Sequence, residues 1–160
     1  MGTRTSAREM VELIRQRLAA ADFAGFADLF ADDGVFEYPF VVPGWPPVLH
    51  GRAEIREHVV ESRRDVRSRI ELTGFETTVH ETTDPEVVVV EHEASGITVA
   101  TGEPFRFASG VGVLTVRDGK VVHYRDYANP IGAAIAAGRL PELAAGLAAM
   151  AAPAEAVAGS

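Results

Sequence analysis

Gly119-Lys-Val-Val-His-Tyr-Arg-Asp-Tyr-Ala-Asn-Pro130 is the segment around which this chain is organised. Asp118-Gly119 lies between two β-branched runs and predicts a two-residue hairpin turn, because such a turn needs positive φ angles. The valines and tyrosines that follow favour a strand over residues 120–128. Asn129-Pro130 predicts the start of a helix, since asparagine caps free N–H groups and proline fits the first helical position. Asp126 therefore stands in an otherwise apolar strand, either on an exposed face or as an acid or base in a pocket.

Composition limits the class of protein. The chain has 160 residues, of which 47% are apolar and 24% charged, as in an ordinary globular domain. Its net charge of −8 argues against nucleic acid or an anionic membrane as the partner. The absence of cysteine excludes disulfides, thiolate metal sites and cysteine nucleophiles. No apolar run has the length of a membrane span and the N-terminus lacks a signal-peptide core, so we expect a cytoplasmic protein.

The N-terminal third predicts two helices, a short strand and a loop. Ser6 and Glu9 have the spacing of a capping box, and apolar residues follow at helical intervals. Asp22 precedes a second short helix, which we expect to end at the Asp-Asp-Gly of residues 32–34. A strand over residues 35–40 follows, and its proline places it at an edge or bend. The loop over residues 41–49 contains the only tryptophan, Trp45, and is either folded over the core or a lid over a pocket.

Residues 51–67 predict the most informative helix. Its inward stripe consists of Ile55, His58, Val59, Ser62 and Val66, whereas the arginines lie largely off it. His58 and Ser62 lie one turn apart on this stripe and can face the same space. The pair is either core packing or part of a pocket. The five histidines, at positions 50, 58, 80, 92 and 123, show no close ligand spacing, so we expect no metal site.

Four long strands are predicted after this helix, over residues 70–80, 86–96, 105–117 and 120–128. Helices followed by an antiparallel meander make an α+β arrangement. Two short helices are expected after Pro130, with a break at Gly138. We therefore expect one domain over residues 1–151 and a loose tail over residues 152–160.

The turn at Asp118-Gly119 sets a register for the last hairpin. Strict alternation puts Val111 opposite Asp126 and Val113 opposite Tyr124 on one face. The other face would then carry an apolar set beside His123, namely Leu114, Val116 and Val121. An apolar outer face is expected where a sheet meets a partner subunit, so we predict a homodimer. Asp126 beside valines should be poorly solvated, which raises the pKa of its carboxyl group.

The helices, the meander and the terminal Tyr-Arg-Asp-Tyr-x-Asn-Pro strand resemble the SnoaL-like branch of the nuclear transport factor 2-like superfamily. The closest likeness is to the phenazine-biosynthesis A/B proteins, from about Phe36 to Leu143. It includes Gly51-Arg52 with His58 and Ser62 after it, the Val90-Glu91-His92-Glu93 strand, and Asn129-Pro130. The resemblance implies a cone-shaped α+β barrel, in which a curved antiparallel sheet wraps around N-terminal helices and leaves a deep pocket. It also implies a dimer that binds ring precursors and promotes their condensation by acid/base catalysis.

The resemblance also implies site residues. The histidine, serine and glutamate of the phenazine proteins match His58, Ser62 and Asp126, so the acid here is shorter by one methylene. Limonene epoxide hydrolases share the Arg-Asp-Tyr segment but need an Arg-x-Asp on a neighbouring strand, where this chain has Glu91-His92-Glu93. Ketosteroid isomerases carry their base just before a proline on the first strand. That position is Tyr38 here, and alternation turns the preceding Glu37 to the opposite side.

We therefore predict cofactor-free acid/base catalysis, by condensation, cyclisation or isomerisation, on a small cyclic or polyketide-like metabolite of secondary metabolism. Asp126 would be the main acid or base, His58 its proton-exchange partner, and Ser62 a donor that orients the substrate. Aromatic walls suit planar rings. The predicted substrate-binding residues are Tyr38, Phe40, Trp45, Glu93, Phe107 and Tyr124. A non-catalytic small-molecule-binding module and an epoxide hydrolase are the alternatives.

Overall fold

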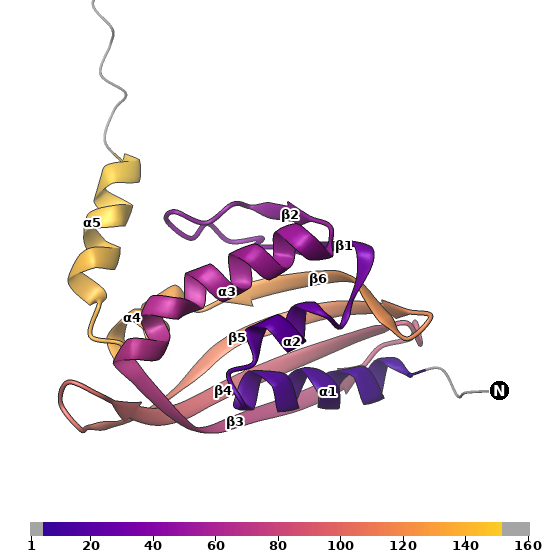
Figure 1. Cartoon of the computed structure of the whole chain (residues 1–160), viewed down its shortest axis with the longest axis horizontal. Helices are drawn as coiled ribbons and strands as arrows, with labels where there is room; N and C mark the ends of the chain where they lie inside the picture. The colour runs from indigo at the N-terminus through magenta and orange to yellow at the C-terminus, as the bar shows by residue number, and fades with distance from the viewer. Residues whose placement is uncertain (1–4, 152–160) are drawn as a thin grey trace, which may run out of the picture.

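A curved antiparallel meander carries three helices on its concave side (Figure 1). The structure is a computed structural model that describes residues 5–151, and the predicted tail over residues 152–160 lies outside them. Its helices are α1 (Ala7–Ala19), α2 (Phe23–Ala27), α3 (Arg52–Arg69), α4 (Pro130–Ala136) and α5 (Leu140–Ala151). Its strands are β1 (Phe30–Glu37), β2 (Val48–His50), β3 (Ile70–Glu81), β4 (Val87–Thr98), β5 (Pro104–Arg117) and β6 (Lys120–Ala128). They form one sheet in the order β2-β1-β6-β5-β4-β3.

Local signals set the ends of the helices as predicted. Ser6 and Glu9 form a reciprocal capping box at the start of α1, with the Ser6 N–H donating to the Glu9 carboxylate at 2.7 Å. The Asn129 side chain accepts from the Gly132 N–H at 3.0 Å and starts α4. Gly138 ends α4 with a φ of 66°, a conformation in which glycine avoids the strain of a side chain. No helix within residues 5–151 is long and apolar enough to cross a membrane.

The first strand corrects one expectation. The helix expected to reach the Asp-Asp-Gly of residues 32–34 ends at Ala27, and β1 already begins at Phe30. The reason is long-range pairing, since Phe30 and Val35 pair in parallel with β6, and residues 31–34 bulge between these two points. β2, which the sequence left within a loop, pairs antiparallel with the other edge of β1. Strand β1 thus joins the loop that contains Trp45 to the central sheet.

The register of the last hairpin is also corrected. The turn pairs Arg117 with Lys120, as predicted, and the next pair is Val116 with Val121. The register then shifts, because β6 contains one residue more, so that Thr115 pairs with His123. Gly112, and not Val111, therefore lies opposite Asp126.

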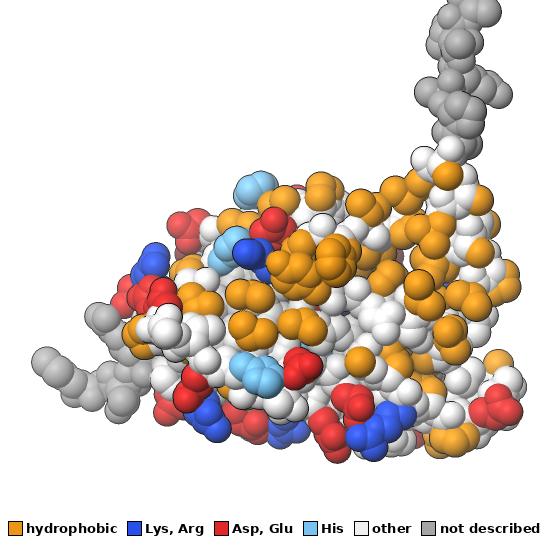
Figure 2. Space-filling model, turned by 180° about the vertical axis from the view of Figure 1, so that it is seen from behind, with side chains coloured by type: hydrophobic (Ala, Val, Ile, Leu, Met, Phe, Trp, Pro, Cys, Tyr) orange, Lys and Arg blue, Asp and Glu red, His pale blue; other side chains and the backbone are white. Residues whose placement is uncertain are grey.

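This bulge reverses the faces predicted for the apolar residues of the hairpin. Leu114, Val116 and Val121 are buried in the core together with Tyr124, and so cannot form the outer face expected to meet a partner subunit. The outer face instead carries Val113 and Val111, the latter 37% exposed. Figure 2 shows apolar side chains gathered over the middle of this face, with charged groups along its edge. Glu37 also lies away from the core, where its carboxylate contacts His123 at 2.9 Å, as alternation predicted.

Aromatic side chains from helix and sheet form the centre of the core. Phe36 stacks on Tyr124 with ring centroids 5.1 Å apart, and Phe26 of α2 meets Tyr124 edge-on. Such pairs add to the stabilisation that burial already provides. This cluster holds α2 against β1 and β6 and thereby sets the floor of the space described next.

Candidate active site

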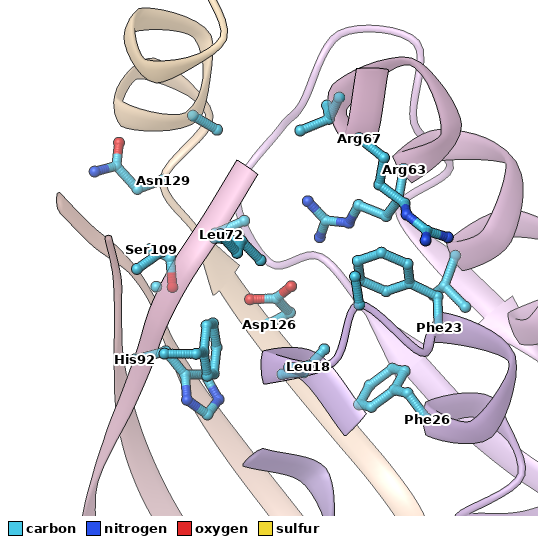
Figure 3. Close-up of a pocket in the computed structure, with 18 of the residues that line it drawn as sticks. Leu18, Phe23, Phe26, Arg63, Arg67, Leu72, His92, Ser109, Asp126 and Asn129 are labelled. Atoms are coloured by element: carbon cyan, nitrogen blue, oxygen red, sulfur yellow. The ribbon is translucent and has the colours of Figure 1, made fainter. Parts of the chain in front are cut away.

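A cavity of about 400 Å³ lies between the concave face of the sheet and the helices. The side chains and backbone that border it come from nearly every element, as Figure 3 shows for a part of them. Apolar and aromatic groups make most of the wall: Leu18, Phe23, Phe26, Phe36, Trp45, Val59, Val66, Leu72, Phe75, Phe107 and Tyr124. The polar and charged groups are fewer: Arg63, Arg67, His92, Ser109, Asp126 and Asn129. A largely apolar space with a few convergent polar groups is typical of a small-molecule site.

Asp126 reaches the cavity from β6. Its neighbours across the sheet are glycines of β5, and a Cβ built on Gly110 would lie 3.3 Å from the Asp126 Oδ1 atom. A larger residue at that position would crowd the carboxylate, so the glycine leaves the carboxylate room. Within residues 5–151, no group hydrogen-bonds to the Asp126 carboxylate or pairs with it as a salt bridge. Its oxygen atoms are therefore available to a bound molecule.

Burial raises the pKa of Asp126 from its ordinary value of 3.8 to about 6. The cause is desolvation, because the carboxylate lies at the bottom of a mostly apolar cavity. The Arg63 guanidinium opposes this shift, since a nearby cation favours the charged carboxylate. The direction of this shift agrees with the prediction, but Val111 and Val113, the neighbours predicted for Asp126, lie on the outer face and do not cause it. A carboxyl group with a pKa near neutrality can both accept and return a proton.

Helix α3 presents to the cavity a face that only partly matches the predicted stripe. The bordering residues Val59, Arg63, Val66 and Arg67 recur at helical spacing. In Figure 3 the two arginines lie on the helix side of the cavity, with Asp126 on the sheet side. Val59 and Val66 of the predicted stripe do border the cavity, and Ile55 and Val59 are buried in the core, but the cavity wall extends to Arg63 and Arg67 and not to His58 and Ser62.

The structure thus corrects the placement of His58 and Ser62, neither of which borders the cavity. The His58 Nε2 atom hydrogen-bonds to the Tyr38 hydroxyl at 3.0 Å, and the His58 ring meets Trp45 edge-on. Burial, and then the charge of Arg63, lower the pKa of His58. The Ser62 Oγ atom is buried without a hydrogen-bond partner in the described chain. The cation that acts on Asp126 is therefore Arg63 and not His58.

The predicted substrate-binding residues divide into two groups. Trp45, Phe107 and Tyr124 border the cavity. Tyr38 is buried behind it, and its hydroxyl contacts His58. Phe40 is 63% exposed and packs against Tyr127, away from the cavity. Glu93 points outward because strand alternation turns it from the cavity, and it pairs there with Arg106.

Several polar residues that border the cavity were not predicted from the sequence as site residues. Ser109 is the extra residue of a bulge in β5, since Ala108 pairs with Glu93 and Gly110 with His92, and a bulge can re-aim a side chain. His92 belongs to the Val90-Glu91-His92-Glu93 segment singled out in the sequence, but its contact with the buried Tyr124 follows only from the fold. Its Nε2 atom contacts the Tyr124 hydroxyl at 3.1 Å, and its Nδ1 atom contacts Thr77. Strict alternation could have marked His92 as inward, whereas no local signal marks Ser109.

The arrangement also limits the alternative chemistries. The resemblance to limonene epoxide hydrolases implies an arginine and a second carboxylate on a neighbouring strand, and the matching positions here are Glu91 and Glu93 of β4. Here Glu91 contacts His80 on the outer face, and Glu93 pairs with Arg106. Asp126 is thus the carboxylate that borders the cavity within residues 5–151. In the same part of the chain, no group of three or more potential ligand side chains is placed to hold a metal ion.

Known proteins share this sequence and fold. The chain is 33% identical over 111 residues to the uncharacterised protein YesE of Bacillus subtilis, covering 69% of this chain and 72% of that protein. It is 29% identical over 126 residues to an uncharacterised PhzA/B-like protein of Pseudomonas aeruginosa, covering 79% and 86%. The solved structure of a Bacillus subtilis protein provisionally assigned as an isomerase matches with a TM-score of 0.68 at 30% identity, covering 83% of this chain and 93% of that one.

The SnoaL-like domain description matches residues 8–124, which is more than half of the chain. The chain therefore belongs to the SnoaL-like family. Solved proteins described as ketosteroid isomerase-like and nuclear transport factor 2-like in fold also match it, which confirms the predicted α+β cone. The predicted likeness to phenazine-biosynthesis A/B proteins is confirmed by the Pseudomonas aeruginosa relative.

Proposed function

We propose that this protein is a cofactor-free isomerase or cyclase that moves a proton on a small cyclic metabolite held in the cavity. Asp126 is the catalytic acid and base. The observation that carries the proposal is the position of this carboxylate, which borders an aromatic cavity, makes no hydrogen bond within residues 5–151 and has a pKa raised to about 6. The assignment of the Bacillus subtilis structure as an isomerase supports the same class of reaction.

The reaction begins with proton abstraction from carbon. The ionised Asp126 carboxylate takes a proton from a C–H group next to a carbonyl of the substrate, and the C–H electron pair moves into an enolate. The protonated Asp126 then returns this proton to another carbon, which isomerises the ring. Alternatively, the enolate carbon attacks a second carbonyl and closes a ring, and the protonated Asp126 gives its proton to the alkoxide oxygen that this attack creates. Both outcomes conserve atoms and electrons without an oxidant. The Arg63 guanidinium stabilises negative charge that develops in the cavity.

The walls of the cavity fit this role. Trp45, Phe75 and Phe107 offer flat apolar surfaces to a planar ring. They also limit the water around Asp126, and a site with little water strengthens the electrostatic interactions inside it. A volume of about 400 Å³ has the size of sites for small organic ligands. The substrate class is therefore a small cyclic ketone or a related enolisable ring.

Exchange of carbon-bound protons tests the proposal without knowledge of the natural substrate. The two-ring ketone 2-tetralone in D₂O serves as the probe, and NMR follows the loss of its C–H signals next to the carbonyl. The wild type should accelerate exchange, and Asp126→Asn should slow the catalysed rate by about a hundredfold or more, the usual scale for loss of a general acid or base. Glu93→Gln is the matched control and should keep the wild-type rate, because Glu93 lies on the outer face with Arg106.

Two outcomes contradict the proposal in different ways. If Asp126→Asn exchanges at the wild-type rate, Asp126 is not the base. If the wild type binds 2-tetralone without accelerating exchange, the chain is a ligand-binding module rather than an enzyme. Binding is measured separately by quenching of Trp45, the only tryptophan, which borders the cavity.

We also propose that the chain works as a homodimer joined through the outer face of the sheet. The apolar residues on this face are Val89, Val111 and Val113, and the exposed Phe40 packs beside them on Tyr127. An apolar patch in the middle of an exposed sheet face is stabilised when a second layer covers it. This surface takes the place of the predicted set around Leu114, which belongs to the core.

A further inference from the structure

Two arginines border the cavity without an acidic partner. Most arginines of the described chain pair with a carboxylate, for example Arg64 with Glu61 at 3.0 Å and Arg117 with Glu86 at 2.9 Å. Arg63 and Arg67 form no such pair within residues 5–151, although the chain carries a net charge of −8. In a protein with an excess of acidic groups, a cation left without a partner inside a cavity indicates that its partner comes from outside.

The surroundings of Arg63 fit a role in ligand binding. Its guanidinium carbon lies 5.2 Å from the ring centroid of Trp45 and 5.9 Å from that of Phe23. Such cation–π contacts hold the planar group in one orientation and leave its N–H edges free for other bonds. Arg63 is half-buried, so it reaches into the cavity, whereas Arg67 is exposed and stands one helical turn further along α3.

We propose that Arg63 and Arg67 bind a carboxylate on the substrate, so that the protein prefers cyclic organic acids to neutral rings of the same size. This inference rests on the proposed function and names the substrate class of the same site. A guanidinium presents paired N–H groups that match the two oxygens of a carboxylate. Figure 3 shows Arg63 and Arg67 on the helix side of the cavity and Asp126 on the sheet side. In the proposed binding mode the substrate carboxylate meets the arginines and the reacting carbon faces Asp126.

The same arrangement accounts for the lack of an ion pair between Arg63 and Asp126. Arg63 lowers the pKa of Asp126, but the two side chains form no salt bridge. A direct pair would hold the carboxylate fully charged and would occupy both groups. Because they stay apart, Asp126 can exchange protons while Arg63 holds the anion.

Binding of paired probes tests this inference. The probes are 2-naphthoate and its neutral analogue 2-naphthamide, and calorimetry at pH 7.5 measures their affinities. The wild type should bind the carboxylate at least tenfold more tightly than the amide. Arg63→Gln and Arg67→Gln should each weaken naphthoate binding by about tenfold, and the double variant by about a hundredfold, as expected when a charge-assisted hydrogen bond is lost. Naphthamide binding should change by less than about twofold, since the amide has no charge to lose.

Two controls keep the test decisive. Arg64→Gln should leave both affinities unchanged, because Arg64 is exposed and pairs with Glu61 away from the cavity. Arg63→Lys keeps the charge and should retain part of the preference, even if Arg63→Gln proves unstable in thermal melts. Equal affinity of the wild type for both probes, no naphthoate binding at millimolar concentration, or a preference that survives in the double variant would overturn the inference.

The outcome is separable from that of the proposed function. Asp126→Asn should abolish proton exchange and still prefer naphthoate over naphthamide, because the arginines stay in place. If Asp126→Asn loses proton exchange but the wild type shows no preference for naphthoate, only the proposed carboxylate site is refuted. A carboxylate preference without exchange in the wild type would instead refute only the catalytic role of Asp126.

Discussion

Replacing Asp126 by asparagine should stabilise the folded protein at high pH and change its stability little at low pH. The pKa of Asp126 is about 6 in the folded state, against an ordinary value of 3.8. Below 3.8 the carboxyl group is neutral in both states, so its neutral form costs the folded state nothing. Between pH 3.8 and pH 6 the unfolded chain releases this proton while the folded chain keeps it, because ionisation would charge a desolvated group. The wild type therefore loses stability as the pH rises from 3.8 through 6, whereas Asp126→Asn does not, because asparagine does not ionise.

The two pKa values differ by 6 − 3.8 = 2.2. At about 1.36 kcal/mol per unit, this amounts to about 3 kcal/mol, of which about 2 kcal/mol develops between pH 4.5 and pH 8. Urea unfolding of the wild type and of Asp126→Asn at several pH values measures the difference between their free energies of unfolding. Subtracting the wild type cancels the titration of the other carboxyl groups. Glu93→Gln, outside the cavity, is the control for a carboxylate-to-amide change.

The result that refutes the reasoning is a difference that stays constant with pH or falls as pH rises. A constant difference would mean that Asp126 is as well solvated in the folded protein as in the unfolded chain. A fall would mean that Asp126 has a favourable charged partner in the folded state, and the acid/base role would lose its basis. Global unfolding of Asp126→Asn at every pH would show that the side chain is structural.

Two further predictions concern the core and the outer face. His92→Phe should cost about 2 kcal/mol at pH 7, because the Tyr124 and Thr77 hydroxyl groups lose their partner. Burial lowers the pKa of His92 from 6.5 to about 4, so the stability that neutral His92 contributes is fully present above pH 6.5 and is lost as the pH falls through 4. The free energy of unfolding of His92→Phe should therefore fall less between pH 7 and pH 5 than that of the wild type. Urea titrations that show an equal fall for both proteins would contradict this prediction. Sedimentation equilibrium of the wild type at micromolar concentration should show twice the chain mass of 17.1 kDa, and Val111→Lys should show the single mass, because Val111 lies on the apolar outer face. A monomeric wild type would argue against the proposed interface.

Local chemistry made much of the fold predictable. Ser6 with Glu9, and Asn129 with Pro130, act within a few residues, so their helix starts follow from sequence alone. The Asp118-Gly119 turn likewise needs only its own positive φ angles, which the structure shows at both residues. Asp126 was predictable as an inward acid because it shares a face with Tyr124, two residues earlier and beyond the bulge.

The faces of the elements were less predictable, because they depend on partners far away in the chain. The prediction for α3 followed its apolar stripe and chose His58 and Ser62, whereas packing turned Arg63 toward the cavity. A stripe specifies a helical face only to within part of a turn, and arginine can bury its stem while its charged end faces polar space. The sequence alone could not choose between these two neighbouring faces.

The amino-acid sequence by itself determined where the four long strands and most of the helices of this protein lie, and that an acid stands in an apolar strand. Tertiary structure alone decided which side chains meet in the cavity. One extra residue in β6 places Leu114 and Val121 in the core instead of on the predicted outer face, and the extra residue of β5, Ser109, borders the cavity. The physical reason is that a strand alternates with a period of two, so a single bulge inverts every side chain beyond it. Where a bulge forms is set by pairing across the sheet and by packing of the core, both of which join residues distant in sequence.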